Sequence, residues 1–445
     1  MSKLLICNAR MVNEGQVREG DLLVVDGRID QIGADITAPP GAQVIDAAGQ
    51  VLMPGMIDDQ VHFREPGVTH KGDLATESHA AIAGGITSYM EMPNTNPQTV
   101  TLERLEDKYG LARGRAWGNH AFYLGATNDN IDEIRRLAPN QTCGIKVFMG
   151  ASTGNMLVDR VETLEQIFAD APTLIATHCE DTPTIQANEQ RYREQYGDEI
   201  PMRFHPLIRS EEACWKSSSM AVDLARRHGT RLHVLHLTTA RELALFDAGP
   251  ISAKRITAEA CVHHLYFSEA DYARRGSFIK CNPAIKRVED RDALRAALAE
   301  DRLDVIATDH APHTLEEKQE ISYFKAPAGL PLVQHAVAMA LELVHDGVLS
   351  LPQAVQKVSH GPAELFKVRG RGYLREGYWA DLALVDMQSP QRVERGDVLY
   401  KCGWSPLEGD TLRSRVTTTL VNGELKYRNG EFFGVADGMR LEFDR

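Results

Sequence analysis

A short polar stretch in the first part of the chain holds several side chains that can do chemistry. The sequence "PGMIDDQVHFREPG", residues 54–67, follows a β-like run and places Asp59, Gln60, His62 and Arg64 close together. Imidazole and carboxylate groups bind metals or transfer protons. A guanidinium pairs with a carboxylate through two parallel hydrogen bonds. The spacing therefore indicates a metal or acid–base centre beside an anion-binding group.

Residues of the same kinds recur at or near the ends of later apolar runs. Lys146 lies in "GIKVFMG", His178 ends "TLIATH", His236 lies in "RLHVLHL" and Asp309 in "LDVIATDH". Any one of them could be a hydrogen-bonded core or rim residue, but corresponding positions in several runs favour a common site. Imidazole nitrogen and carboxylate oxygen suit zinc, and a catalytic zinc site keeps one position open for water.

The sequence allows two interpretations of the role of Lys146. Its neighbours are apolar, so a buried ammonium beside cations would be penalised by desolvation and by repulsion. If the neutral amine captures carbon dioxide, the resulting carbamate is an anionic oxygen ligand that can bridge two metals. The alternative is a lysine whose charged head reaches solvent at the strand end. The spacing alone does not choose between them.

The elements that would position these residues alternate along the chain. Eight short apolar runs predict strands: "VLMPGMID", "ITSYMEMP", "NHAFYLGA", "GIKVFMG", "TLIATH", "RLHVLHL", "RITAEAC" and "LDVIATDH". Most precede helical patterns such as "TLERLEDKYGLARGR", "RVETLEQIFADA", "TARELALFDAG" and "EDRDALRAALAE". This alternation predicts parallel strands with right-handed crossovers, and eight units predict an α/β fold of the (β/α)₈ TIM type. Strand ends then meet at one mouth, where active sites are built.

The two ends of the chain differ from the middle. Residues 1–53 hold short β-rich runs, with a hairpin turn predicted at Asp26-Gly27 in "LLVVDGRIDQIG". Residues 371–445 also hold short β-rich runs, with Asn-Gly turns at 422–423 and 429–430. We expect these two segments to pair into a small β-sandwich beside a barrel of residues 54–370.

Composition narrows the function classes. The 445 residues carry a formal net charge of −13, which argues against a general nucleic-acid or anionic-membrane surface. Seven scattered cysteines fit reduced thiols better than a disulfide framework. The opening "MSKLLICNARMV" resembles a first strand rather than a signal peptide, and no run approaches the ~18 apolar residues of a membrane span. We expect a soluble cytoplasmic protein with a small-molecule substrate.

Several motifs in order carry a resemblance to a known family. They are "DDQVHFREPG", "EMPNTNP", "GIKVFMGAST", "THCED", "HVLHLTTA", "CNPAIK" and "ATDHAPH", spread over nearly the whole chain. Together they closely resemble the dihydroorotases, which belong to the cyclic amidohydrolase group of the amidohydrolase superfamily. The resemblance implies a (β/α)₈ barrel with a flanking β-sandwich, a two-zinc centre and often a homodimer. It also implies the interconversion of N-carbamoyl-L-aspartate and L-dihydroorotate in de novo pyrimidine synthesis.

The same resemblance implies roles for the metal-site residues. His62 would bind one zinc, His178 and His236 would bind the other, and a carboxylated Lys146 would bridge the two. Asp309 would bind the first zinc and carry a proton between the attacking water and the leaving nitrogen. A zinc ion lowers the pKa of a bound water toward ~7.

A second set of residues is implied to bind the substrate. These residues would hold the substrate carboxylate at one end and the amide groups of the ring at the other. The first group is Arg64, Asn94 and His313, and the second is Asn282 with the backbone around Ala328 and Gly329.

One residue departs from the family pattern. The first strand of the superfamily normally ends in His-x-His, whereas this chain reads Gln60-Val61-His62. An amide oxygen is a weaker zinc ligand than imidazole, so we expect the first metal position to be weak, empty, or completed by water or by Asp59, with Gln60 as a further candidate ligand. The alternatives are one zinc ion or two per subunit.

Two other functions remain open. An allantoinase or hydantoinase would share the metals but would not need an arginine matched to a ring carboxylate. A catalytically silent partner protein, for example of aspartate transcarbamoylase, is the other alternative, and metal-dependent turnover would exclude it.

Overall fold

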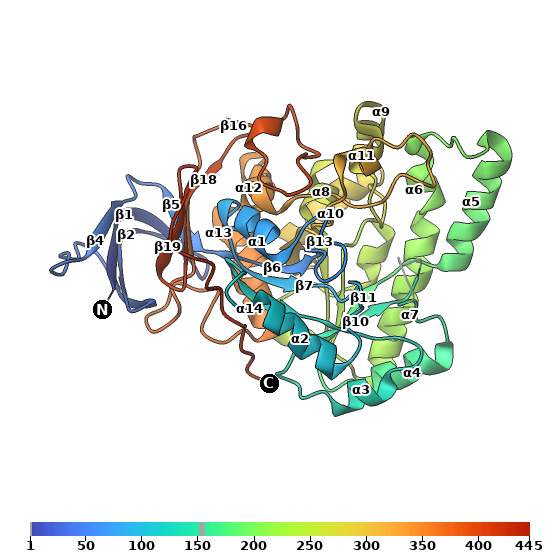
Figure 1. Ribbon diagram of the computed structural model, residues 1–445, viewed down its shortest axis with the longest axis horizontal. Helices are drawn as coiled ribbons and strands as arrows, with labels where there is room; N and C mark the ends of the chain where they lie inside the picture. The colour runs from blue at the N-terminus through green and yellow to red at the C-terminus, as the bar shows by residue number, and fades with distance from the viewer. Residues whose placement is uncertain (1, 151–155) are drawn as a thin grey trace.

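The computed structural model describes residues 2–150 and 156–445, and a barrel of parallel strands lies at its centre (Figure 1). Its strands are β6 (Met56–Val61), β7 (Ile86–Glu91), β8 (Asn119–Phe122), β9 (Leu124–Gly125), β10 (Ile145–Phe148), β11 (Ile175–His178), β12 (Leu232–Val234), β13 (Ile256–Cys261) and β14 (Val305–Ala307). Neighbours pair in parallel from β6 to β8 and from β9 to β14. A parallel bridge between Val61 and His310 brings the end of the last strand against the first. The predicted (β/α)₈ barrel is confirmed.

Helices follow the strands along the chain and surround the barrel in Figure 1. Capping residues mark their limits: Asp73 accepts hydrogen bonds from the first backbone N–H groups of α1, and Gly229 ends α7 with a φ of 66°. The helices are α1 (Leu74–Ala83), α2 (Leu102–Ala112), α3 (Ile131–Arg136), α4 (Val161–Asp170), α5 (Thr182–Tyr196), α6 (His205–Ile208), α7 (Glu211–His228), α8 (Val262–Tyr266), α9 (Tyr272–Arg275), α10 (Val288–Ala299), α11 (Leu315–Lys318), α12 (Ala336–His345), α13 (Leu351–Val355) and α14 (Gly361–Phe366).

One predicted helix is wrong. The segment "TARELALFDAG" forms only a short 3₁₀ turn, Arg241–Leu245. The Thr239 hydroxyl and the Glu242 carboxylate bond to each other at the start of this turn, and the segment runs into Gly249 and Pro250. Glycine and proline both oppose continuation of a helix, so the turn does not extend.

The two ends of the chain meet in one mixed sheet beside the barrel. Its strands are β1 (Lys3–Asn13), β2 (Gln16–Val25), β3 (Arg28–Gly33), β4 (Gln43–Asp46), β5 (Val51–Pro54), β15 (Leu382–Asp386), β18 (Arg415–Val421), β19 (Glu424–Arg428) and β20 (Glu431–Phe432). Strand β5 pairs antiparallel with β15 and so joins the two ends, drawn in blue and red in Figure 1. Strands β16 (Gln391–Arg392) and β17 (Thr411–Leu412) form a separate small pair. The expected pairing of the ends is observed.

The run "VLMPGMID" is not a single strand. Its first half is β5 in the end sheet, and its second half opens β6 of the barrel, with Gly55 between them. We keep the units 1–53, 54–370 and 371–445 as a proposal, and the observed passage from the end sheet to the barrel lies at Gly55. All seven cysteines are free thiols. No helix in the described ranges is both long enough and apolar enough to span a bilayer.

Candidate active site

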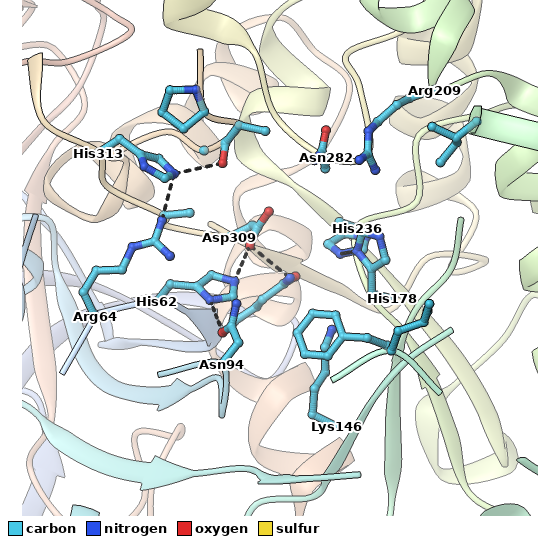
Figure 2. Close-up of a pocket in the computed structure, with 18 of the residues that line it drawn as sticks. His62, Arg64, Asn94, Lys146, His178, Arg209, His236, Asn282, Asp309 and His313 are labelled. Carbon is cyan, nitrogen blue, oxygen red and sulfur yellow. Dashed lines mark hydrogen bonds and ion pairs between the residues drawn. The ribbon is translucent and has the colours of Figure 1, made fainter. Parts of the chain in front are cut away.

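A cavity of about 600 Å³ opens among the carboxyl ends of the barrel strands (Figure 2). The residues predicted for the site line this cavity, with the exception of Asp59. They are Gln60, His62, Arg64, Asn94, Lys146, His178, His236, Asn282, Asp309, His313, Ala328 and Gly329. The last residues of the quoted "GIKVFMGAST" lie outside the described residues.

The strand ends place the central residues. His178 is the last residue of β11, and His236 and Asp309 follow β12 and β14 after one further residue. The backbone of Arg64, His236 and Asp309 has φ values of 70°, 42° and 47°, in the left-handed region that side chains other than glycine rarely adopt. Such conformations persist where the surrounding structure fixes them, and they concentrate at functional sites.

Two histidines face each other through one ring nitrogen each. Nδ1 of His178 lies 3.1 Å from Nε2 of His236, while Nε2 of His178 lies 3.1 Å from the carboxylate of Glu180. The contact with Glu180 assigns the His178 proton to Nε2 and leaves a lone pair on Nδ1. Burial lowers the pKa of both rings, so both are neutral. A tetrahedral zinc ion with bonds of 2.0–2.1 Å holds two nitrogens about 3.3 Å apart, so this spacing fits a shared metal.

A second pair of candidate ligand atoms lies beside the first. Nδ1 of His62 lies 2.8 Å from the side-chain oxygen of Asn94, which places the ring proton on Nδ1. The free Nε2 then faces Oδ1 of Asp309 at 3.1 Å. Burial lowers the pKa of His62, although Asp309 opposes this shift. A neutral imidazole lone pair that faces a carboxylate oxygen is a suitable place for a cation.

Lys146 lies near both pairs. Its side chain is buried, and its Nζ packs 4.6 Å from the ring of Phe148, without a hydrogen bond or ion pair to any described residue. Burial lowers the pKa of Lys146 to about 8, although Asp309 and Glu259 oppose the shift. Its charge also lowers the pKa of His62 and of His178. The buried amine between the two pairs therefore has no counterion in direct contact among the described residues.

Gln60 turns its amide nitrogen toward Asp309. Nε2 donates to Oδ1 of Asp309 at 3.1 Å, and Oε1 receives the thiol of Cys261 at 3.8 Å. In this orientation the amide oxygen points away from the His62 and Asp309 pair, and ligation by Gln60 stays a prediction that requires the amide to rotate. Asp59 is also turned away, with its carboxylate 3.4 Å from Nε2 of His233.

Arg64 and His313 form the opposite wall. Nε of Arg64 donates to the carbonyl of Pro312 at 3.0 Å, which fixes the guanidinium. Lys71 donates to Nδ1 of His313 at 3.0 Å, and Nε2 of His313 lies 3.0 Å from the carbonyl of Ala328. The neutral ring therefore carries its proton on Nε2 and cannot also accept from Nη2 of Arg64, 3.2 Å away. The outer N–H groups of Arg64 remain available to a ligand in the cavity.

The third side of the cavity offers groups for a ring amide. Oδ1 of Asn282 is buried without a hydrogen-bond partner in the described ranges. Gly329 has a φ of 147°, and an added Cβ would lie 2.4 Å from the carbonyl oxygen of Ala311, so only glycine fits there. Its N–H donates to the carbonyl of Lys280 and its carbonyl accepts from Lys318. These contacts hold the 328–329 backbone at the cavity wall.

Sequence reasoning missed Glu180 and Arg209. Glu180 accepts from Nε2 of His178 and pairs with Arg209, which also lines the cavity. Burial raises the pKa of Glu180, but Arg209 and His178 outweigh this and bring the pKa to about 2. A carboxylate on the far nitrogen of a metal-binding histidine fixes its tautomer and raises its basicity. The motif "THCED" could have indicated Glu180 as a partner of His178, because Glu180 stands two residues after it.

Comparison with known proteins places the chain in a family. Residues 51–426 match the sequence model of the Amidohydrolase family. This chain belongs to the amidohydrolase family. The amidohydrolase is 34% identical to the dihydroorotase of Methanosarcina acetivorans over 422 residues, which cover 92% of this chain and 89% of the relative. It is also 30% identical to the allantoinase of Bacillus velezensis over 433 residues, which cover 96% and 94% of the two chains.

The solved structures agree with the fold. The L-hydantoinase (dihydropyrimidinase) of Arthrobacter aurescens superposes with a TM-score of 0.93 at 27% identity, and the match covers 99% of this amidohydrolase and 100% of that chain. The resemblance to dihydroorotases and the barrel with its additional sheet are therefore confirmed. Allantoinases show nearly the same sequence identity, so the substrate must be argued from the site.

Proposed function

We propose that this amidohydrolase is a cytoplasmic dihydroorotase (EC 3.5.2.3), which interconverts N-carbamoyl-L-aspartate and L-dihydroorotate in the synthesis of UMP. The observation that carries the proposal is the Arg64 guanidinium. Its outer N–H groups face the cavity, while the neutral ring of His313 beside it offers them no lone pair. A guanidinium held this way matches a substrate carboxylate. The hydantoin and allantoin rings lack that carboxylate.

The donor set supports a metal centre. We propose that His62, Asp309 and a carboxylated Lys146 hold one zinc ion, and that His178, His236 and the same carbamate hold a second. When bound, zinc polarises the amide carbonyl and lowers the pKa of water. Two observations support this assignment: the two facing pairs of side chains, and the Lys146 amine, which has no hydrogen bond or ion pair within the described ranges.

The chain's own residues would orient the substrate and move the proton. Arg64, with Asn94 and His313, would bind the carboxylate and so fix the ring in the cavity. The free Oδ1 of Asn282 would accept from a ring N–H. Asp309 would accept a proton from the attacking water at its carboxylate and donate it to the ring nitrogen as the amide bond breaks. In the direction of cyclisation the same transfers run in reverse.

A substrate panel tests this assignment against its rivals. The zinc-supplemented protein is assayed for kcat/KM with L-dihydroorotate, allantoin, hydantoin and dihydrouracil. The proposal predicts the highest value for L-dihydroorotate by more than tenfold. A higher value for allantoin or a hydantoin would assign one of those activities instead. Failure to turn over any of them, or N-carbamoyl-L-aspartate, would favour a silent partner protein.

Replacement of Arg64 by Met should impair L-dihydroorotate selectively. The change removes a charge-assisted contact worth roughly 1.5–3 kcal/mol, so kcat/KM should fall by about 10- to 150-fold. A slow cyclic amide without a carboxylate, such as dihydrouracil, serves as the internal control and should lose much less. An equal loss for both compounds would show that Arg64 maintains the structure of the site rather than binding the carboxylate.

Replacement of Gln60 by His tests the inequality of the two metal positions. In the natural protein we expect metal at His62 and Asp309 to leave first under chelation, because Gln60 offers no imidazole nitrogen there. The histidine variant should retain that metal at higher chelator concentration. Metal content is followed during titration with a chelator. Two positions of equal affinity in the natural protein would contradict this reading of Gln60.

The family resemblance also suggests a homodimer, and we keep this as a prediction. Light scattering of the purified protein would give a mass of twice 49.3 kDa.

A further inference from the structure

A second group of metal-binding side chains lies outside the set described above. Strand β13 ends at Cys261 and helix α8 begins with the next residue, so Cys261, His263 and His264 follow closely at this junction. Each offers one ligand atom, and these atoms all lie within 4.8 Å of one another. All three side chains are buried. Figure 1 shows the labels of β13 and α8 close together in the barrel.

Three of the four ring nitrogens in this cluster lack a hydrogen-bond partner among the residues that the structure describes. Neither ring nitrogen of His263 has a hydrogen bond within the described part of the chain, and neither does Nδ1 of His264. Nε2 of His264 lies 3.1 Å from the carbonyl of Pro283, so the proton belongs on Nε2 and Nδ1 keeps its lone pair. The backbone of Thr308 faces His263 without reaching hydrogen-bond geometry. Buried polar atoms without partners are costly and rare, and a bound cation would satisfy them.

The thiol connects the cluster to the cavity. Sγ of Cys261 lies 3.8 Å from Oε1 of Gln60, and Gln60 lines the cavity while its nitrogen bonds to Asp309. The cluster therefore lies directly behind Gln60 in the cavity wall.

We propose that Cys261, His263 and His264 bind a divalent ion of borderline softness, such as zinc, at a position separate from the two metals of the proposed function. One thiolate and two imidazoles are ligands that zinc accepts in tetrahedral sites, and the amide oxygen of Gln60 or a water can supply the fourth. On binding, the Cys261 S–H bond breaks, its proton leaves to solvent and the sulfur electron pair is donated to the metal. Such an ion would fix the end of β13 and the orientation of Gln60.

The sulfur ligand gives this site a spectroscopic signature. The ligands proposed for the other two metals are nitrogen and oxygen atoms, so cobalt bound there shows no thiolate charge transfer. The purified protein is depleted of metal and titrated with Co²⁺ while its near-ultraviolet absorption is recorded. We expect a thiolate-to-cobalt band that saturates at one thiolate-bound ion per chain.

Three serine variants identify the cysteine whose sulfur binds cobalt. The band should disappear in Cys261→Ser and persist in Cys281→Ser and Cys179→Ser. Cys281 is a matched control, because it is buried with its Sγ 3.7 Å from Nε2 of His264, on the side away from the free Nδ1. Cys179 controls for the thiol next to His178. His263→Gln should weaken the cobalt affinity of the band at least tenfold.

The proposal is overturned if the natural protein binds cobalt without a thiolate band, or if the band survives in Cys261→Ser. If that variant does not fold, X-ray absorption of the zinc-loaded natural protein decides the matter. A sulfur neighbour at about 2.3 Å supports the site, and a shell of only nitrogen and oxygen refutes it. Both readouts report metal ligation rather than turnover, so they stand whichever substrate the enzyme uses.

Discussion

Replacement of Asp309 by Asn is expected to leave the protein folded and to lower kcat by on the order of 10²-fold or more. Oδ1 of Asp309 accepts a hydrogen bond from Nε2 of Gln60 at 3.1 Å and lies 3.1 Å from the unprotonated Nε2 of His62, so an anionic oxygen is held between the two side chains. Asparagine keeps the size of the side chain but cannot accept and return a proton. It also removes an anionic ligand. Steady-state kinetics with L-dihydroorotate measure the loss, and thermal unfolding confirms the fold.

Asp58 offers a matched control for Asp309. It is a buried carboxyl group bonded to the hydroxyl and backbone N–H of Thr308, and it does not line the cavity. Burial raises its pKa to about 8, so it is mostly protonated at neutral pH and resembles an amide. Asp58→Asn should therefore retain most of the activity. Near-natural turnover in Asp309→Asn would contradict the proton-transfer role.

Replacement of Lys146 by Ala should abolish metal binding and activity together. The variant removes the amine that we propose to carry the carbamate bridge, so both metal positions lose a ligand. Short-chain carboxylic acids should restore part of both, because their carboxylate can occupy the space left by the bridge. Metal content and kcat are measured with and without added acetate or propionate. Full activity in the variant, or a plain amine in electron density at a metal-loaded active site, would refute the carbamate.

Lys108 is the matched control for Lys146. It is equally buried, but its Nζ pairs with Glu91 at 2.9 Å and donates to the carbonyl of Met92 at 3.0 Å. Lys146 has no comparable partner among the described residues, and burial lowers its pKa to about 8. Lys108→Met should reduce stability because it leaves Glu91 unpaired, while the folded fraction retains metal and shows no rescue by carboxylic acids.

Local sequence patterns predicted the barrel and the residues that lie together at the carboxyl ends of its strands. Parallel strands buried on both faces appear as short apolar runs, and their carboxyl ends must converge, so His178 and Asp309 could be placed together from sequence position alone. The division of "VLMPGMID" into β5 and β6 depends on pairing with β15, more than 300 residues away in the chain. The failed helix at 239–249 ends in glycine and proline, which oppose continuation of a helix.

Other features of the site depend on contacts between distant segments. Arg209 reaches Glu180 from a turn after α6, and no periodic pattern marks it. The orientation of Gln60 follows from Asp309 on one side and Cys261 on the other. The proton position on His313 follows from Lys71 and Ala328. Each of these features affects how the site can bind a ligand or a metal, and each can be recognised only in the three-dimensional structure.

The most direct test of the dihydroorotase assignment approaches one equilibrium from both sides. Metal-free and zinc-loaded protein are incubated separately with N-carbamoyl-L-aspartate and with L-dihydroorotate, and both compounds are quantified over time. We predict that the zinc-loaded protein brings both reactions to the same ratio of the two compounds, and that the metal-free protein converts neither. Failure of the zinc-loaded protein to interconvert the two compounds, with its fold and metal content verified, would contradict the assignment.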